Sequence, residues 1–424
     1  MLHYQVESVK RLLFQCNIGL EKESLRVDSQ GRMARTRHPF SEDDPHITRD
    51  FCENQTEVNT SVCSSAEEAV AEVARHTATI QRALAQLPER EYLWPFSNPP
   101  YIEDEDDIPV AVFEGARASK TTYRERLADN YGKYKMAFSG IHFNFSFGEE
   151  LLRADFRESG ESDFQEYKNR LYLELAEKAI AYGWVITAVT AASPLMDASF
   201  FTRDRKDEDA FVGMGSVRCS ELGYWNHFAP ILNYEDIVSY AASIRRYVDD
   251  GVISAPTELY YPIRLKPRGQ NNLETLAREG VDHIELRMFD LNPLVAAGID
   301  ERDAFFAQLL LIFLASSPRL KLSARAQVMA VHNFKNAARY DLGSVKILLP
   351  NDSAYVLSAA GRTILGQMKK FFADAGARVL ETLSFQEEKF VNPSARYPSV
   401  VRRLYGDGFW RKGLQLAKER QAEL

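Results

Sequence analysis

Several features are scarce in this 424-residue sequence, and each scarcity narrows the possible functions. The four cysteines stand in no zinc-type or CxxC spacing, so we expect buried free thiols. No apolar stretch approaches the roughly 20 residues that a membrane-spanning helix needs. The formal net charge of -8 lacks the basic excess that binding to nucleic-acid phosphates requires. These absences argue against a membrane or nucleic-acid partner and favour small-molecule ligands.

The sequence also lacks the glycine-rich loops by which many enzymes hold nucleotide phosphates. Residues 115–121, GARASKT, resemble such a loop but have no second glycine before Lys120, so we interpret the likeness as chance. The first residues, MLHYQVESVKRLLFQ, have no apolar core or cleavage-like small residues. We therefore expect no signal peptide and a cytoplasmic location. If the protein uses a nucleotide, it must therefore bind the phosphates through metal ions and arginines.

What is present is a mixture of helical and strand-like patterns. Alternation of apolar and polar residues predicts strands at 17–27, 141–147, 258–266 and 283–291. Helical spacing is found at 66–87, 163–182, 235–248, 301–316, 356–376 and 409–421. Because no regular strand–helix–strand order connects these segments, we expect an α+β fold with a largely antiparallel sheet. No linker interrupts the chain, so residues 1–424 are predicted to form a single domain.

Each predicted strand has one apolar face for helices to cover and one polar face, because successive side chains alternate. The polar faces carry, strand by strand, Glu21 and Glu23; His142, Asn144 and Ser146; and Glu285 and Arg287. Such a strand is common wherever one side of a sheet meets water. The combination of a Glu-x-Glu, a His-x-Asn and a Glu-x-Arg pair instead favours a functional site.

An acidic segment, DFCENQTEV at residues 50–58, adds Asp50, Glu53 and Glu57. If these segments are neighbours, five or six carboxylates and one histidine line one side of the sheet. Like charges so close repel unless cations lie among them. Oxygen-rich sites with little nitrogen suit Mg²⁺ or Mn²⁺. Magnesium in turn favours phosphate chemistry.

Eight motifs occur in an order that resembles the bacterial glutamate–cysteine ligase family, including the ligase part of the fused glutathione synthetases. They are GLEKESLRV, DFCENQTEV, YLWPFSNPP, YRERLADNYG, SGIHFNFSF, LGYWN, ELYYPIRLK and IELRMFDLNP. The resemblance covers roughly residues 17–300, and residues 301–424 are expected to be a helical C-terminal part. It implies a fold similar to glutamine synthetase, with a curved, mainly antiparallel sheet forming a funnel and helices outside.

The resemblance also implies roles for individual residues. The metal ligands fall on Glu21, Glu23, Asp50, Glu57, His142 and Glu285. Arg287 is expected to contact the transferred phosphoryl group, with Glu21 and Glu285 as the other catalytic residues. The acceptor pocket falls on Phe51, Tyr123, Arg218, Tyr224 and Tyr260, and Arg124 lies close to the glutamate site. From their position on the strand we add Arg264 and Lys266 as nucleotide contacts beside Arg287.

The activity implied is ligation of the γ-carboxylate of L-glutamate to the amine of L-cysteine, with ATP and Mg²⁺, through γ-glutamyl phosphate. Asn54, Gln55, Asn59 and Asn98 are polar where relatives are often apolar. The acceptor therefore stays open, and the alternative is a γ-glutamyl ligase for another small amino acid or amine. A phosphotransferase that forms no amide and a non-catalytic binding protein are further alternatives.

Overall fold

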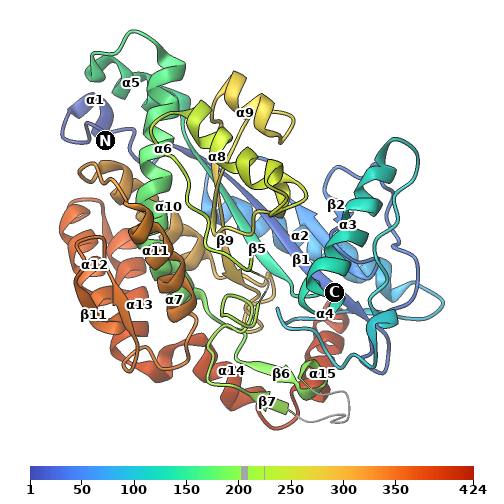
Figure 1. The fold of residues 1–424 in the computed structure, drawn as a ribbon. Coiled ribbons are helices and arrows are strands. Elements are labelled where there is room, and N and C mark those ends of the chain that lie inside the picture. The colour runs from blue at the N-terminus through green and yellow to red at the C-terminus, as the bar shows by residue number, and fades with distance from the viewer. Residues whose placement is uncertain (202–208, 224) are drawn as a thin grey trace.

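The computed structural model describes residues 1–201, 209–223 and 225–424. Its centre is an open antiparallel sheet in the order β2-β3-β1-β5-β9-β8, with β4 paired to the end of β1 (Figure 1). Its strands are β1 (Cys16–Val27), β2 (Ile47–Arg49), β3 (Gln55–Asn59), β4 (Tyr92–Leu93), β5 (Gly140–Phe147), β8 (Ile263–Lys266) and β9 (His283–Asp290). Two small antiparallel pairs join β6 (Leu195–Asp197) to β7 (Asp209–Phe211) and β10 (Lys346–Leu348) to β11 (Ala354–Val356).

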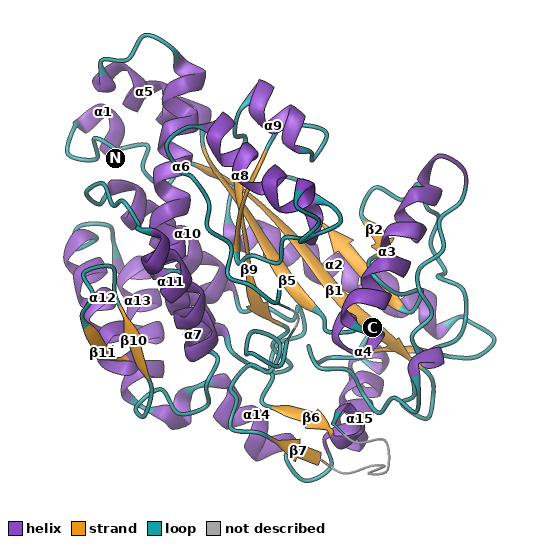
Figure 2. Cartoon of the chain, viewed as in Figure 1, coloured by secondary structure: helices purple, strands orange, loops and turns teal. Residues whose placement is uncertain are grey.

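Helices surround this sheet and dominate the C-terminal part of the chain (Figure 2). They are α1 (Glu7–Lys10), α2 (Ala66–Ala85), α3 (Ala118–Tyr131), α4 (Lys133–Met136), α5 (Glu149–Ser159), α6 (Phe164–Tyr182), α7 (Trp184–Thr190), α8 (Ile237–Asp249), α9 (Leu273–Glu279), α10 (Glu301–Ser316), α11 (Ala324–Ala337), α12 (Leu357–Phe371), α13 (Ala377–Val391), α14 (Tyr397–Tyr405) and α15 (Phe409–Ala422). Within the described residues, no helix combines the length and apolar character that crossing a membrane requires.

The apolar face of the sheet packs against helices, as the alternating pattern predicts. Phe143 and Phe145 of β5 are fully buried, as are Ile284 and Leu286 of β9. They belong to one core cluster with residues of α6, α7, α10 and α13. Helix α10 is apolar on nearly all sides and contacts α2, α6 and α13, which is the expected environment of such a helix. The opposite face of the sheet is therefore left for polar groups.

The helix starts follow local capping chemistry. Ser65 accepts a hydrogen bond from the backbone N–H of Glu68, whose carboxylate accepts one from the N–H of Ser64. Asp163 caps α6 in the same way. One strand prediction is wrong in part, because of residues 258–266 only Ile263–Lys266 form β8. Pro262 cannot donate a ladder hydrogen bond, so the strand begins after it.

Lys22 is a lysine buried on the helix-covered side of β1, where its Nζ donates to Thr77 Oγ1 of α2 at 3.0 Å. Burial, and then the charge of Arg420, lower its pKa from 10.5 to about 7. The unfolded chain therefore holds a proton between pH 7 and 10.5 that the folded protein releases. The contribution of Lys22 to stability consequently rises with pH across this window.

Lys22→Met is expected to raise the free energy of unfolding at pH 7 by about 2 kcal/mol. Holding a charged lysine there costs about 5 kcal/mol at that pH, whereas leaving Thr77 without its donor costs about 1–3 kcal/mol. The variant should also lose the part of the stability gain between pH 7 and 9 that Lys22 provides. Urea unfolding at both pH values measures this, with Lys321→Met at an exposed position as the control. Equal stability of the two proteins at pH 7 would contradict a costly charge at Lys22.

Candidate active site

The strand register brings the predicted polar residues together on one face of the sheet. Glu21 of β1 lies opposite His142 of β5, and Glu23 lies opposite Glu57 of β3. On the other side of β5, Asn144 lies opposite Glu285 of β9. Segments that are far apart in the sequence thus present their carboxylates and the histidine to the same region of the molecule.

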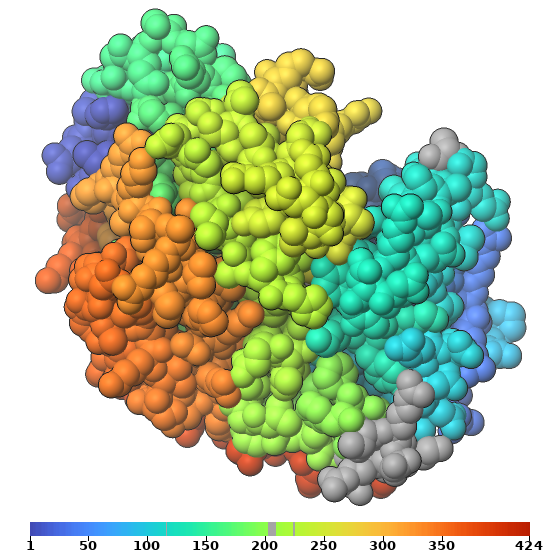
Figure 3. Space-filling view, in the orientation of Figure 1, coloured from blue at the N-terminus to red at the C-terminus, as the bar shows by residue number. Residues whose placement is uncertain are grey.

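Glu21, Glu23, Glu57 and His142 line a hollow of about 740 Å³, whereas Glu285 and Asn144 are not part of its wall. Its walls are formed by Glu21, Glu23, Asp50, Phe51, Glu57, Tyr123, Arg124, Leu127, Met136, His142, Thr257, Tyr260, Arg264 and Arg287. Eleven of these fourteen residues were predicted from the sequence. A second hollow of about 930 Å³ shares Glu21 and is also lined by Arg268 and His283. Figure 3 shows the molecular surface cut in between the region of α8 and α9 and the region that carries α3.

His142 is the centre of the acidic cluster. Its Nδ1 lies 2.9 Å from Glu21 Oε2 and 3.7 Å from Glu285 Oε1, and its Nε2 lies 3.7 Å from Glu23 Oε1. Burial, and then the charge of Arg287, lower the pKa of the His142 imidazole. A neutral imidazole has a lone pair with which it can bind a metal ion.

Glu285 lies among cationic groups on the same face. Its Oε1 is 3.1 Å from Arg287 Nη1 and 3.4 Å from Lys266 Nζ, and the side chain is 1% exposed. Burial raises the pKa of Glu285, but the charges of Arg287 and Lys266 outweigh it and hold the pKa well below its usual value. Glu285 is therefore an ionised carboxylate inside the protein.

The other end of the cluster is short of positive charge. Burial and the neighbouring Asp50 carboxylate raise the pKa of Glu23 to about 8. The same two causes raise the pKa of Glu57 well above its usual value, and Glu21 and Glu23 add to the effect. In the absence of a cation these carboxylates repel one another, so a divalent cation would reverse the shift.

Two buried atoms support the fit of these residues to a metal ion. Among the described residues, His142 Nε2 and Glu285 Oε2 are buried and have no hydrogen-bond partner. One ligand atom each from Glu21, His142 and Glu285 lies within 4.8 Å of the others. Buried polar atoms are normally paired, so unpaired ones that face several carboxylates match a cation site. The donor set of oxygens and one imidazole is compatible with Mg²⁺ or Mn²⁺.

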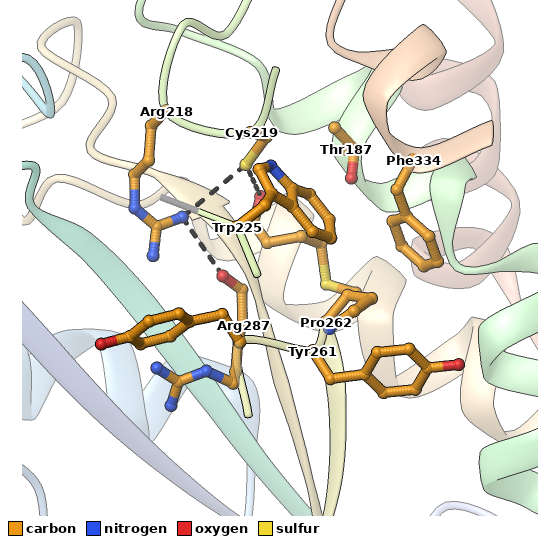
Figure 4. Close-up of a pocket in the computed structure, with 10 residues that line it drawn as sticks. Thr187, Arg218, Cys219, Trp225, Tyr261, Pro262, Arg287 and Phe334 are labelled. Carbon is orange, nitrogen blue, oxygen red and sulfur yellow. Dashed lines mark hydrogen bonds between the residues drawn. The ribbon is translucent and has the colours of Figure 1, made fainter. Parts of the chain in front are cut away.

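Arg218 approaches the site from the loop that follows β7. Its Nη1 donates to the backbone oxygen of Arg287 at 3.2 Å (Figure 4). The same atom donates to the backbone oxygen of Phe289, also at 3.2 Å. Gly140 makes this approach possible, because a Cβ atom there would overlap with the Arg218 guanidinium. The Gly140 N–H also donates to Glu23 Oε2 at 2.8 Å. The sequence pattern gave no sign of this close approach.

The remaining predicted residues differ in how they reach the site. Tyr260, Arg218 and Arg287 line an adjoining pocket together with Cys219 and Trp225. In Figure 4 the guanidinium groups of Arg218 and Arg287 extend to the same side. The predicted contact Tyr224 lies outside the described residues.

Basic residues reach the hollow from two elements. Arg124 on α3 donates through its Nε to the backbone oxygen of Asp50. Arg264 on β8 lines the hollow and donates to the backbone oxygen of Leu259 at 2.6 Å. Lys266 is two residues further along the same face and reaches the hollow's edge through its ion pair with Glu285. All three therefore flank the acidic cluster.

The sequence missed some walls of the hollow. Leu127, Met136 and Thr257 lie on it but carry no charge that alternation could highlight. The Tyr260 hydroxyl donates a hydrogen bond to the Met136 sulfur, with 3.9 Å between oxygen and sulfur. Leu127 belongs to the motif YRERLADNYG, but no place in the site was predicted for it.

The polar departures from the family pattern support the walls of the site. The buried amide of Asn54 donates to two backbone carbonyl oxygens, and Gln55 donates to that of Phe138, just before β5. Asn98 donates to the backbone oxygens of Ser193 and Leu195. The amide nitrogens of these three side chains all donate within the fold, and none of the three lines the hollow.

A comparison with known families decides the relationship. The sequence profile of the family described as glutamate–cysteine ligase matches residues 2–252 and 228–337, more than half of the chain. The chain belongs to the glutamate–cysteine ligase family. The resemblance stated from the eight motifs is thereby confirmed.

Curated relatives are longer than this family member. The glutathione biosynthesis bifunctional protein GshAB of Listeria monocytogenes is 34% identical over 411 residues, which are 93% of this chain and 53% of the relative. The protein of the same name from Clostridium perfringens is 32% identical over 399 residues, with 91% and 50% covered. The chain thus spans about half the length of these relatives.

Solved structures of the family share the fold. Glutamate–cysteine ligase of Francisella tularensis, solved in complex with AMP, matches with a TM-score of 0.87 at 21% identity, covering 96% of this chain and 89% of that chain. A bifunctional glutathione synthetase from Pasteurella multocida matches with a TM-score of 0.82 at 26% identity, covering 100% and 54%. The expected α+β class with a mainly antiparallel sheet is confirmed, and the sheet is not closed.

Proposed function

We propose that this family member joins the γ-carboxylate of L-glutamate to the amino group of L-cysteine, using ATP and Mg²⁺. The observation that carries the proposal is the convergence of Glu21, Glu57, His142 and Arg287 on one hollow. Carboxylates that repel one another beside arginines fit a site that accepts metal ions and phosphate groups together. Residues 1–424 would act as one catalytic domain, since one core cluster runs from Leu2 to Phe390.

The proposed metal ligands divide into two groups along the cluster. Glu21, His142 and Glu285 form one group, with ligand atoms already close together. Glu23, Asp50 and Glu57 form the other, where the raised pKa values of Glu23 and Glu57 mark the missing charge. Magnesium ions bound there would neutralise the phosphate oxygens of ATP. The nucleotide has room in the adjoining hollow with Arg268. Arg264 on the first hollow and Lys266 beside Glu285 add positive charge.

The chemistry then proceeds in two steps. An oxygen of the glutamate γ-carboxylate attacks the terminal phosphorus of ATP, and ADP leaves. Arg287 disperses the negative charge on the transferred phosphoryl oxygens, while Arg124 holds the glutamate. The amine of the acceptor next attacks the acyl carbon of γ-glutamyl phosphate, loses a proton and expels inorganic phosphate. Positioning and electrostatics carry the catalysis, and no enzyme nucleophile is needed.

The acceptor is proposed to bind beside Arg218 and Tyr260. The Arg218 guanidinium is suited to a carboxylate, and Phe51 and Tyr123 supply aromatic walls. Cys219, Trp225 and Met288 make the adjoining pocket mostly apolar, which suits a small neutral side chain such as that of cysteine. All four cysteines of the chain are free and buried, which fits a proposed cytoplasmic location.

The test is a product analysis with ATP, glutamate, Mg²⁺ and a panel of small amines that includes cysteine. We expect γ-glutamylcysteine, ADP and phosphate in equal amounts, with cysteine giving the highest kcat/KM. Preference for another amine would assign the alternative acceptor. ADP formed without any amide product would instead identify a phosphotransferase.

Arg218→Gln is expected to raise the KM for the acceptor by about 10–100-fold and to change kcat much less. A hydrogen bond between charged groups contributes about 1.5–3 kcal/mol, and this one would be made equally before and during the reaction. Steady-state kinetics with cysteine as the varied substrate measures the effect. Arg339→Gln, at an exposed position that pairs with Glu221, serves as the control. An unchanged KM for the acceptor would exclude Arg218 from its binding.

A further inference from the structure

A second group of metal-binding side chains lies outside the candidate active site. It joins His46, just before β2, to Glu72 and His76 of α2. One ligand atom from each lies within 4.8 Å of the others. The two imidazole rings stack with their centroids 4.6 Å apart. None of the three residues lines the hollow in which the ligase chemistry is proposed.

The position and tautomer of His46 are fixed by backbone contacts. Its carbonyl oxygen accepts from the N–H of Asn59 at 2.7 Å. Its ring Nδ1 lies 2.9 Å from the carbonyl oxygen of Asn59. A carbonyl can only accept, so Nδ1 carries a proton and Nε2 is the nitrogen left to bind a metal ion. Histidines that bind metals in proteins are oriented in this way.

Glu72 is held in a similar manner. It is buried, and its two carboxylate oxygens accept from the N–H of Ser61 at 3.1 Å and from the thiol of Cys63 at 3.2 Å. Glu72 and His76 are four residues apart on α2, so both side chains project from one face of the helix. A backbone N–H and a thiol thus fix the carboxylate beside the two imidazoles.

The separation of the ligand atoms matches a shared cation better than a hydrogen bond. His76 Nε2 lies 3.4 Å from Glu72 Oε1, beyond the 2.7–3.2 Å of a good hydrogen bond. Two ligands on a tetrahedral zinc ion, each about 2.0–2.1 Å from the metal, lie about 3.3 Å apart. His76 therefore needs no movement relative to Glu72, and a ligand atom of His46 lies within 4.8 Å of both.

We propose that His46, Glu72 and His76 bind one Zn²⁺ ion, with water in the fourth position. Two imidazoles and one carboxylate are typical zinc ligands, whereas Mg²⁺ prefers oxygen and would stay at the acidic cluster. The His76 side chain is 20% exposed, which gives the ion a path from solvent. The proposal is independent of the ligase chemistry.

The bound ion would connect α2 to the two strands at the edge of the sheet. His46 immediately precedes β2, and its backbone partner Asn59 ends β3. Asp50 lies in the segment between β2 and β3, and Glu57 lies on β3. Zinc would therefore stabilise the part of the sheet that supplies two of the proposed magnesium ligands.

The experiment uses the full chain, freed of metals and then given excess Mg²⁺ so that zinc does not fill the acidic cluster. Zinc is titrated in competition with a chromogenic chelator, and X-ray absorption reports the ligands. We expect one Zn²⁺ per chain, bound through two imidazoles and one carboxylate. The midpoint of thermal unfolding should rise by several degrees, about 3–5 °C.

His76→Gln should weaken zinc binding by more than about 100-fold, because removal of a supporting contact alone costs 10–100-fold. His142→Gln, in the acidic cluster, and His332→Gln, an exposed position on α11, should leave it unchanged. Circular dichroism verifies that each variant is folded, and His46→Gln provides a second test. The proposal would be overturned if His76→Gln bound zinc as tightly as the natural protein does. It would also be overturned if His142→Gln lost zinc binding, or if the natural protein bound no zinc in excess Mg²⁺.

Discussion

Glu285→Gln is expected to lower kcat/KM for ligation by at least about 1,000-fold. The substitution removes one negative charge while the cations Arg287 and Lys266 stay within 3.4 Å of the position. It therefore removes a proposed magnesium ligand and leaves buried cations uncompensated, and each loss is costly in a water-poor site. Glu21→Gln should have an effect of the same order, because Glu21 is the nearest acidic neighbour of His142.

The measurement is ADP release coupled to amide formation, at saturating glutamate and over a range of cysteine concentrations that gives kcat/KM. Glu149→Gln makes the same chemical change at an exposed position of α5 and should retain full activity. If Glu285→Gln keeps near-normal turnover, the assignment of metals to this cluster fails. Raising the Mg²⁺ concentration should restore part of the activity of Glu21→Gln if the loss lies in metal affinity.

Arg287→Lys is expected to lower kcat by about 1,000-fold while the KM for the acceptor changes less than about threefold. Arginines that stabilise charge on a transferred phosphoryl group contribute 10³–10⁵ in rate. A lysine keeps the charge but loses the planar fork that reaches two oxygens at once. The expected split between kcat and KM is the reverse of that for Arg218→Gln, so the two variants separate phosphoryl transfer from acceptor binding.

Pre-steady-state measurement of ADP formation without acceptor locates the defect of Arg287→Lys in the first step. Arg245→Lys, on the exposed side of α8, is the matched control. A raised KM for cysteine with an unchanged kcat would place Arg287 in the acceptor pocket and contradict its phosphoryl role.

The side-chain alternation of the strands was enough to predict which residues share a face. Glu21, His142 and Glu285 were expected on the polar side, and the register places them there. The order of the strands in the sheet could not be read from alternation, because it depends on contacts between distant segments. The family resemblance implied a curved, mainly antiparallel sheet but gave no strand order.

Other features depend on close approaches that leave no periodic signal. Residues 258–262 follow the alternation of β8 yet lie outside it, because Pro262 interrupts the ladder. Arg218 can take its position because Gly140 has no Cβ atom. A pattern of polar and apolar residues does not reveal such a contact. His46 is 26 residues from Glu72 in the sequence, and only the pairing of β2 with β3 brings it to α2.

Gly140 links the two halves of the proposed reaction through a single backbone position. Its N–H orients Glu23 on the metal side, and its bare Cα admits Arg218 on the acceptor side. A methyl group at this point would disturb nucleotide activation and amine capture together. Substitutions at outer wall residues such as Cys219 or Trp225 can consequently change the acceptor preference alone. A substitution at Gly140 would affect the proposed phosphoryl transfer as well.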